Sequence, residues 1–203
     1  MTCSQCPAPA THSALLSPPP ARPVKATVGG CTVKYRTLVV DPPWSYSLRQ
    51  DDATHRGRCK YPMMGVDQLG ALGVSGWAEP DAHLYIWTTN AFLVEAHTLA
   101  QAWGFVQKTL VTWCKTSIGL GNYYRNSTEH ALFCVRGKLP VIRHDVPTHF
   151  TAPRGRHSAK PEAFYDMVES MSPGPYLDVF ARRQRMGWDT WGNECFTPEG
   201  LAL

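Results

Sequence analysis

The sequence predicts an α/β fold in which a mostly parallel β-sheet is covered by helices on both faces. Short apolar runs, typical of buried strands, alternate along the chain with segments whose apolar residues recur at helical spacing. Several of these runs end directly before prolines or polar residues, which favours strands that stop there. Because ligands bind at the carboxyl ends of the strands in such sheets, the residues just after the runs are the first candidates for a functional site.

Six segments are predicted as strands. The first, residues 38–40, is wholly apolar and must end at Asp41, because two prolines follow that residue. Cys134 lies inside another apolar run and is expected to be a small core residue. The remaining predicted strands lie at residues 83–88, 109–113, 131–135, 176–181 and 188–191.

Two helices are predicted between the strands. Asn90 is expected to cap the first helix and Gly104 to end it. Pro161 suits the first turn of the second helix, which must break at Ser172-Pro173-Gly174-Pro175. The stripes expected to be buried are Phe92, Ala96, Leu99 and Trp103 in the first helix and Phe164, Met167, Val168 and Met171 in the second.

The length of 203 residues suits one domain with a proper core. Residues 1–23 contain six prolines and are expected to form a flexible tail, which leaves residues 24–203 as the folded domain. No run approaches the roughly 18 apolar residues of a membrane span, and the start lacks the pattern of a secretory signal. The seven cysteines follow no disulfide spacing, and Cys3 and Cys6 lack a second pair to complete a metal site. These features predict a cytoplasmic protein that requires no metal.

The formal net charge is +4, which is compatible with nucleic-acid binding but is no proof of it. The distribution of the charge says more, because basic residues gather at 49–60, 143–157 and 182–185. Each cluster by itself also suits a solvated surface.

The residues that carry chemistry follow the first predicted strand as Asp41-Pro42-Pro43-Trp44. An aromatic amine such as that of adenine is a poor nucleophile, because its lone pair is delocalised into the ring. Acceptors placed on its two hydrogens favour the more tetrahedral nitrogen that attack requires, and the Asp41 carboxylate and the Pro42 carbonyl can supply them. The prolines fix φ and so hold these acceptors rigidly, while Trp44 offers a face on which an extruded base can stack. The alternative is a proline-rich turn with Trp44 in the core.

An ordered series of motifs extends this signature over roughly residues 35 to 195. The series resembles the DPPW adenine-N6 methyltransferases, a family that includes the catalytic subunit of the messenger-RNA N6-adenosine methyltransferase and many bacterial and phage enzymes. The motifs that carry the resemblance are Asp41-Pro42-Pro43-Trp44, Tyr61-Pro62-Met63, Leu84-Tyr85-Ile86-Trp87-Thr88-Thr89-Asn90, Trp113-Cys114-Lys115-Thr116, Glu129-His130, Lys160-Pro161-Glu162, Ser172-Pro173-Gly174 and Trp191-Gly192-Asn193-Glu194.

The resemblance implies a Rossmann-like methyltransferase fold in permuted order, with the catalytic motif before the cofactor half. S-adenosyl-L-methionine is the implied cofactor, and this agrees with the absence of the Gly-x-Gly-x-x-Gly pattern of dinucleotide enzymes. The implied catalytic residues are Asp41, Pro42, Pro43 and Trp44. The implied cofactor-binding residues are Lys160, Asp178, Phe180, Arg182, Asn193 and Glu194.

The matched positions differ in how closely they follow the family's pattern. Lys160 matches a lysine that meets the methionine carboxylate of the cofactor, and Asp178 matches an acid on the ribose hydroxyls. Asp178 also lies inside an apolar strand, where an acid needs a partner. Glu194 departs from the messenger-RNA enzyme, which has an amide there, and the stretch between Arg182 and Trp188 is shorter than in that enzyme.

Nucleic-acid contacts are expected from side chains that can stack on bases or pair with phosphates. The loop at 119–128 holds two tyrosines and an arginine of this kind, although ordinary loop aromatics are the alternative. The candidate substrate-binding residues are Tyr46, Tyr61, Asn90, Tyr123, Tyr124, Arg125, Arg154 and Arg156.

The sequence therefore predicts an S-adenosylmethionine-dependent N6-adenine methyltransferase that acts on nucleic acid, with DNA as the first substrate. RNA is the alternative substrate, and a small molecule or another base is a further one. A catalytically inactive nucleic-acid-binding subunit is the alternative of another class, which the intact Asp41 motif disfavours. Because no separate target-recognition domain is recognised, we expect weak sequence selectivity or specificity borrowed from a partner subunit or a second copy.

Overall fold

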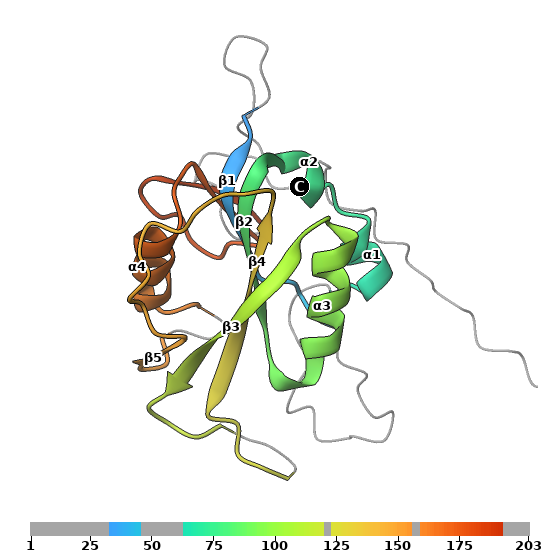
Figure 1. The fold of residues 1–203 in the computed structure, drawn as a ribbon. Helices are drawn as coiled ribbons and strands as arrows, with labels where there is room; N and C mark the ends of the chain where they lie inside the picture. The colour runs from blue at the N-terminus through green and yellow to red at the C-terminus, as the bar shows by residue number, and fades with distance from the viewer. Residues whose placement is uncertain (1–32, 46–62, 120–122, 156–158, 193–203) are drawn as a thin grey trace, which may run out of the picture.

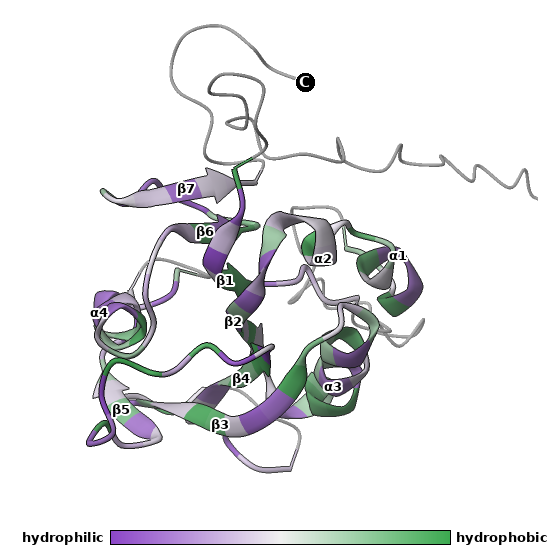
Figure 2. Cartoon of the chain, turned by 45° about the horizontal axis from the view of Figure 1, so that its top comes forward, coloured by the Kyte–Doolittle hydropathy of each residue, from purple (hydrophilic) through white to green (hydrophobic). Residues whose placement is uncertain are grey.

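The computed structural model describes residues 33–45, 63–119, 123–155 and 159–192. They build a seven-stranded sheet in the order β5-β3-β4-β2-β1-β6-β7 (Figures 1 and 2). Every strand is parallel to its neighbours except β4, which is antiparallel to both β2 and β3. The mostly parallel sheet is therefore confirmed. The strands are β1 (Tyr35–Val40), β2 (Ala78–Thr88), β3 (Val106–Lys115), β4 (Thr128–Arg136), β5 (His149–Ala152), β6 (Tyr176–Val179) and β7 (Trp188–Trp191).

Helices cover both faces of the sheet, as predicted (Figure 2). Side chains alternate across a strand, so Leu38 and Val40 of β1 pack into one core cluster and Val39 into the other. The first cluster lies under α1, α2 and α3, and the second lies under α4. The helices are α1 (Val66–Gly70), α2 (Val74–Trp77), α3 (Leu93–Ala102) and α4 (Glu162–Met171).

The predicted strands all occur; β7 has the predicted limits and the other five have changed limits. β2 begins five residues earlier than expected, and β5, α1 and α2 were not predicted because each is too short to display a period. β6 ends at Val179 instead of continuing to residue 181, because Phe180 adopts a φ of 62° and turns the chain out of the sheet. Cys134 is fully buried, as expected.

The prediction that Asn90 caps the helix after β2 is wrong. Asn90 begins a 3₁₀ turn (Asn90–Phe92), Phe92 occupies the N-cap of α3, and neither element has a side-chain cap. The Asn90 side chain contacts His130 instead. The prediction that Gly104 ends this helix is confirmed, because Gly104 follows α3 with a φ of 77°. Three of the four predicted stripe residues are buried, namely Ala96, Leu99 and Trp103, and Phe92 is half-buried.

The parallel strands bring their carboxyl ends to one edge of the sheet, where the antiparallel β4 begins. This edge holds Asp41 after β1, Asn90 after β2 and Phe180 after β6. In the part of the chain that the structure describes, no helix combines the length and apolar character needed to cross a bilayer. The predicted tail at residues 1–23, with Cys3 and Cys6, lies outside the described residues.

Candidate active site

Backbone hydrogen bonds fix the turn that follows β1. The Asp41 N–H donates to the Val179 carbonyl (3.2 Å), which ties the turn to the end of β6. The Trp44 N–H donates to the Pro42 carbonyl (2.8 Å), and the Met64 N–H donates to the Pro43 carbonyl (2.9 Å). A carbonyl oxygen has two lone pairs, so Pro42 can accept one further hydrogen bond while the turn holds it in place.

Trp44 lies in the core beside this turn. Its side chain is 7% exposed, its indole N–H donates to the Trp87 carbonyl (3.2 Å), and its ring stacks on Phe92 with centroids 5.2 Å apart. One face of the indole is therefore covered by protein. Its predicted role as a platform for an extruded base stays a prediction and would need the other face or a movement of Phe92.

Three of the predicted site residues meet at the carboxyl edge as a charged cluster. The Lys160 ammonium lies 3.4 Å from an Asp41 carboxylate oxygen and 3.4 Å from an Asp178 carboxylate oxygen. The Lys160 and Asp178 side chains are each 4% exposed, and the Asp41 side chain is 18% exposed. The chain segments are far apart in sequence, since Asp41 follows β1, Asp178 lies in β6 and Lys160 precedes α4.

Burial and the neighbouring charges together set the pKa values of this cluster. Burial raises the pKa of Asp41, and the Asp178 carboxylate adds to the rise, while the Lys160 and Arg182 charges oppose it. Burial alone would lower the pKa of Lys160, but the carboxylates of Asp178 and Asp41 outweigh it and the pKa is raised. Lys160 therefore stays protonated. With both acids ionised, the side chains of Asp41, Asp178 and Lys160 together carry one net negative charge, which the nearby Arg182 charge offsets in part.

The backbone next to this cluster is held in an uncommon conformation. Phe180 is the non-glycine residue with positive φ among those described, and such a φ is rare for a bulky side chain. Its N–H and that of Ala181 both donate to the Trp191 carbonyl (2.5 and 3.2 Å), which ties the end of β6 to that of β7. A side chain at Gly192 would meet the Ala181 carbonyl at 2.6 Å, so only glycine allows this approach. Strain of this kind is typical of ligand-binding edges.

A second polar cluster lies at the same edge, where β4 begins. Glu129 accepts from the Lys115 ammonium (2.5 Å) and from the Trp87 indole N–H (2.8 Å). Glu129 and Lys115 belong to two of the motifs that carry the family resemblance, but neither was predicted as a site residue. In the sequence, each is a charged residue at the start or end of an apolar run, and this position could have indicated a site residue.

His130 holds the candidate substrate residue Asn90. Burial lowers the pKa of His130, so its imidazole is neutral at physiological pH. Its Nε2 lies 2.7 Å from the Asn90 side-chain oxygen and its Nδ1 lies 3.1 Å from the Thr112 hydroxyl. With Nε2 donating to Asn90, the Asn90 amide turns its N–H groups away from His130 and can offer them to an acceptor.

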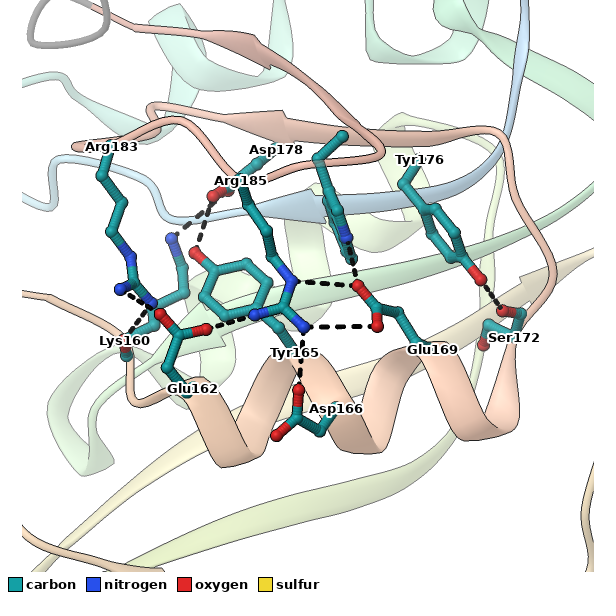
Figure 3. A network of polar contacts seen from close by, with 11 residues as sticks. Lys160, Glu162, Tyr165, Asp166, Glu169, Ser172, Tyr176, Asp178, Arg183 and Arg185 are labelled. Atoms are coloured by element: carbon teal, nitrogen blue, oxygen red, sulfur yellow. Dashed lines mark hydrogen bonds and ion pairs between the residues drawn. The ribbon is translucent and has the colours of Figure 1, made fainter.

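The basic clusters differ in how far their charge is compensated. Arg183 and Arg185 pair with acids of α4, so this part of the predicted 182–185 cluster faces the protein rather than a ligand (Figure 3). Arg143 forms two hydrogen bonds with Asp145 (2.9 and 2.7 Å). Arg154 is exposed and, among the described residues, has no ion-pair partner.

The remaining predicted residues are an exposed loop, a half-buried arginine and five residues outside the described part of the chain. The β3–β4 loop presents Tyr123 and Tyr124, which are 96% and 89% exposed, together with the exposed Arg125. Arg182 is half-buried, near enough to Asp41 for its charge to favour the carboxylate. The predicted residues that lie outside the described part of the chain are Tyr46, Tyr61, Arg156, Asn193 and Glu194.

The chain is similar to known methyltransferases. The MT-A70 family model matches residues 35–194. The type II methyltransferase M.MunI of Mycoplasma sp. is 32% identical over 181 residues, which cover 79% of this chain and 78% of that protein. A probable N(6)-adenosine-methyltransferase MT-A70-like protein of Oryza sativa subsp. japonica is 24% identical, and the N(6)-adenosine-methyltransferase catalytic subunit METTL3 of Homo sapiens is 22% identical. Both alignments cover 79% of this chain but only 23% and 28% of the relatives, so the chain spans about a quarter of their length. With most of the domain matched, the chain belongs to the MT-A70 family of methyltransferases.

Proposed function

We propose that this protein is an S-adenosylmethionine-dependent methyltransferase that acts on the exocyclic amine of adenine in nucleic acid. The observation that carries the proposal is the position of Asp41. Its carboxylate follows β1 in a turn fixed by two prolines, and it lies 3.4 Å from the buried Lys160 at the edge where ligands bind in such sheets.

Asp41 and Pro42 supply the acceptors for the amine. The Asp41 carboxylate accepts one of its two hydrogens, and the free lone pair of the Pro42 carbonyl accepts the other. Because the bonds from Asp41 to Val179 and from Trp44 to Pro42 hold the turn, the acceptors need little reorganisation when the base arrives. Electron density thereby stays on the nitrogen that attacks.

The cationic cofactor suits the negative cluster beside this turn. When bound, S-adenosylmethionine supplies a methyl group on a positively charged sulfur. In our proposal Lys160 binds the cofactor's carboxylate, Asp178 accepts from its ribose hydroxyls, and Phe180 and Arg182 border its nucleoside. Asn193 and Glu194 complete the site in the proposal by contacting cofactor hydroxyls.

DNA is the first substrate of the proposal and RNA is the alternative. The type II methyltransferase is matched over most of its length, whereas the two N(6)-adenosine methyltransferases are matched over about a quarter of theirs. A partner subunit or a second copy would supply target selection. A catalytically inactive binding subunit is disfavoured, because Asp41, Lys160 and Asp178 form one connected cluster.

The test is a mass-spectrometric analysis of nucleosides. DNA and RNA are incubated separately with the protein and methyl-labelled cofactor, and both are digested to nucleosides. Labelled N6-methyl-2′-deoxyadenosine supports the DNA proposal, and labelled N6-methyladenosine supports the RNA alternative. Label on neither, with cofactor binding intact, would favour the inactive subunit.

We expect turnover to fall as the pH is lowered. The fall should occur at a pH above the ordinary pKa of an aspartate. Only ionised Asp41 can accept from the amine without carrying its own proton, and burial raises the pKa of Asp41. Activity should therefore rise with pH until Asp41 is ionised. The measurement is kcat against pH at saturating cofactor and substrate. An acidic limb at or below the ordinary aspartate pKa would contradict the assignment.

We expect the double variant Arg154→Gln/Arg156→Gln to bind DNA more weakly and with a flatter salt dependence. Each arginine–phosphate contact contributes about 0.9 to the slope of log K against log salt, so the slope should fall by up to about 2. Affinities are measured between about 50 and 200 mM salt. Arg143→Gln is the matched control, because Asp145 already compensates Arg143. Equal slopes in all three proteins would place the phosphate contacts elsewhere, with Tyr123, Tyr124 and Arg125 next to be tested.

A further inference from the structure

Tyr165 of α4 makes a direct contact with the predicted ribose-binding acid. Its hydroxyl donates to one Asp178 carboxylate oxygen at 2.7 Å, while the Lys160 ammonium lies 3.4 Å from the other oxygen (Figure 3). Burial raises the pKa of the Tyr165 hydroxyl, so it remains protonated and acts as a donor. The two contacts hold the Asp178 carboxylate from both oxygens and fix its orientation.

The phenol ring of Tyr165 is itself held by charged groups. The Arg185 guanidinium lies 5.3 Å and the Arg183 guanidinium 5.5 Å from the ring centroid, within the range of cation–π attraction. The Trp188 ring packs against the Tyr165 ring in a T-shaped arrangement, with centroids 5.3 Å apart. Tyr165 is only 4% exposed, so its ring has little freedom to turn.

Three acids of α4 keep the two arginines over this ring. Arg185 donates to Glu169 (2.9 Å) and Asp166 (2.8 Å), and it also pairs with Glu162. Glu162 pairs with Arg183 as well. These acids lie at i, i+4 and i+7, on one face of the helix, so the β6–β7 loop is fastened along α4 (Figure 3). The carboxylates therefore orient the arginines, the arginines restrain the Tyr165 ring, and the Tyr165 hydroxyl orients Asp178.

We propose that Tyr165 is a positioning residue for cofactor binding, which aims the Asp178 carboxylate at the ribose hydroxyls. The inference rests on the proposed function, because Asp178 meets the ribose only if the cofactor is S-adenosylmethionine. Tyr165 touches neither cofactor nor base in this proposal. It acts by removing the freedom of the carboxylate to rotate before the ligand arrives.

The test compares Tyr165→Phe with Tyr176→Phe, which removes a hydroxyl from a neighbouring tyrosine. The Tyr176 hydroxyl donates to the Ser172 carbonyl (2.9 Å), so this control also loses one hydrogen bond but none to an acid. Dissociation constants are measured by calorimetry for S-adenosylhomocysteine and for its 2′,3′-dideoxy analogue. Melting temperatures and kcat at saturating cofactor are measured beside them, and Asp178→Asn is included.

We expect Tyr165→Phe to weaken S-adenosylhomocysteine about tenfold, because a hydrogen bond to a charged group is lost. Tyr176→Phe should stay within about twofold of the wild type. The dideoxy analogue should bind wild type and Tyr165→Phe equally, because Asp178 has nothing to meet there, and kcat should be kept.

The outcomes separate this inference from the proposed function. If Asp178→Asn weakens S-adenosylhomocysteine and Tyr165→Phe does not, the positioning role is overturned and the cofactor assignment stands. If Tyr165→Phe weakens both ligands equally, the hydroxyl acts only on the fold, and the inference is overturned. If Asp178→Asn leaves the affinity unchanged, the ribose assignment fails and the Tyr165 inference fails with it.

Discussion

Asp41→Ala is expected to lower the methyl-transfer rate by about 10²-fold or more while cofactor binding survives. The variant removes one of the two acceptors for the amine, and the other, the Pro42 carbonyl, is fixed by the turn and cannot replace it. Lys160 keeps Asp178 as its partner at 3.4 Å, so the part of the site assigned to the cofactor stays charged and paired. Single-turnover rates and calorimetry with S-adenosylhomocysteine measure the two effects separately.

The melting temperature of Asp41→Ala shows whether a loss of activity comes from the missing carboxylate or from a loss of folding. A carboxyl whose pKa is raised by folding stabilises the fold below its unfolded pKa, and this stabilisation is lost as pH rises through the folded pKa. The ionised Asp41 therefore opposes folding, and Asp41→Ala should not lower the melting temperature at a pH where Asp41 is ionised. A variant with an unchanged melting temperature and near-wild-type turnover would show that Asp41 is not the catalytic acceptor.

The sheet could be predicted from the sequence because its central strands are buried on both faces. Residues 38–40 and 131–135 form apolar runs too short and too dense to be anything but core. β5 shows no such run, since three of its four residues are not buried. The helices α1 and α2 have five and four residues, little more than one turn each, so no period could identify them.

The site could be predicted only in part, because its charges are paired across long sequence separations. The rule that ligands meet the ends of parallel strands placed Asp41 and Arg182 together, and the resemblance added Lys160. Neighbouring arginines at 182–185 suggested a free basic patch. Their partners on α4 are separated from Arg185 by 16 to 23 residues, and only the path of the β6–β7 loop brings them together. The local sequence around Asn90 likewise favours a helix cap. In the structure its side chain instead contacts His130, which is 40 residues away.

Lys160→Met is expected to lower both the stability and the cofactor affinity, and it tests the charged cluster as a whole. The variant leaves two carboxylates near each other without the ammonium that pairs with both, and removing one partner of a buried ion pair costs about 3–5 kcal/mol. In the wild type the Lys160 charge opposes the rise of the Asp41 pKa, so without it this pKa should rise further. The loss of stability should therefore grow as pH rises from the ordinary carboxyl range, where protonation relieves the repulsion.

The double variant Lys160→Met/Asp178→Asn separates stability from binding. It removes Asp178, the more deeply buried of the two carboxylates left by Lys160→Met, and with it their mutual repulsion. It should therefore recover much of the melting temperature at neutral pH, while its affinity for S-adenosylhomocysteine stays low. Melting temperatures at about pH 5 and about pH 8 for the wild type and both variants measure the first effect, and calorimetry measures the second. If Lys160→Met melted like the wild type at both pH values and bound S-adenosylhomocysteine equally well, Lys160 would be an ordinary helix-start lysine. The ion pairs of the Lys160 ammonium with Asp41 and Asp178 would then contribute nothing to the stability of the fold or to cofactor binding.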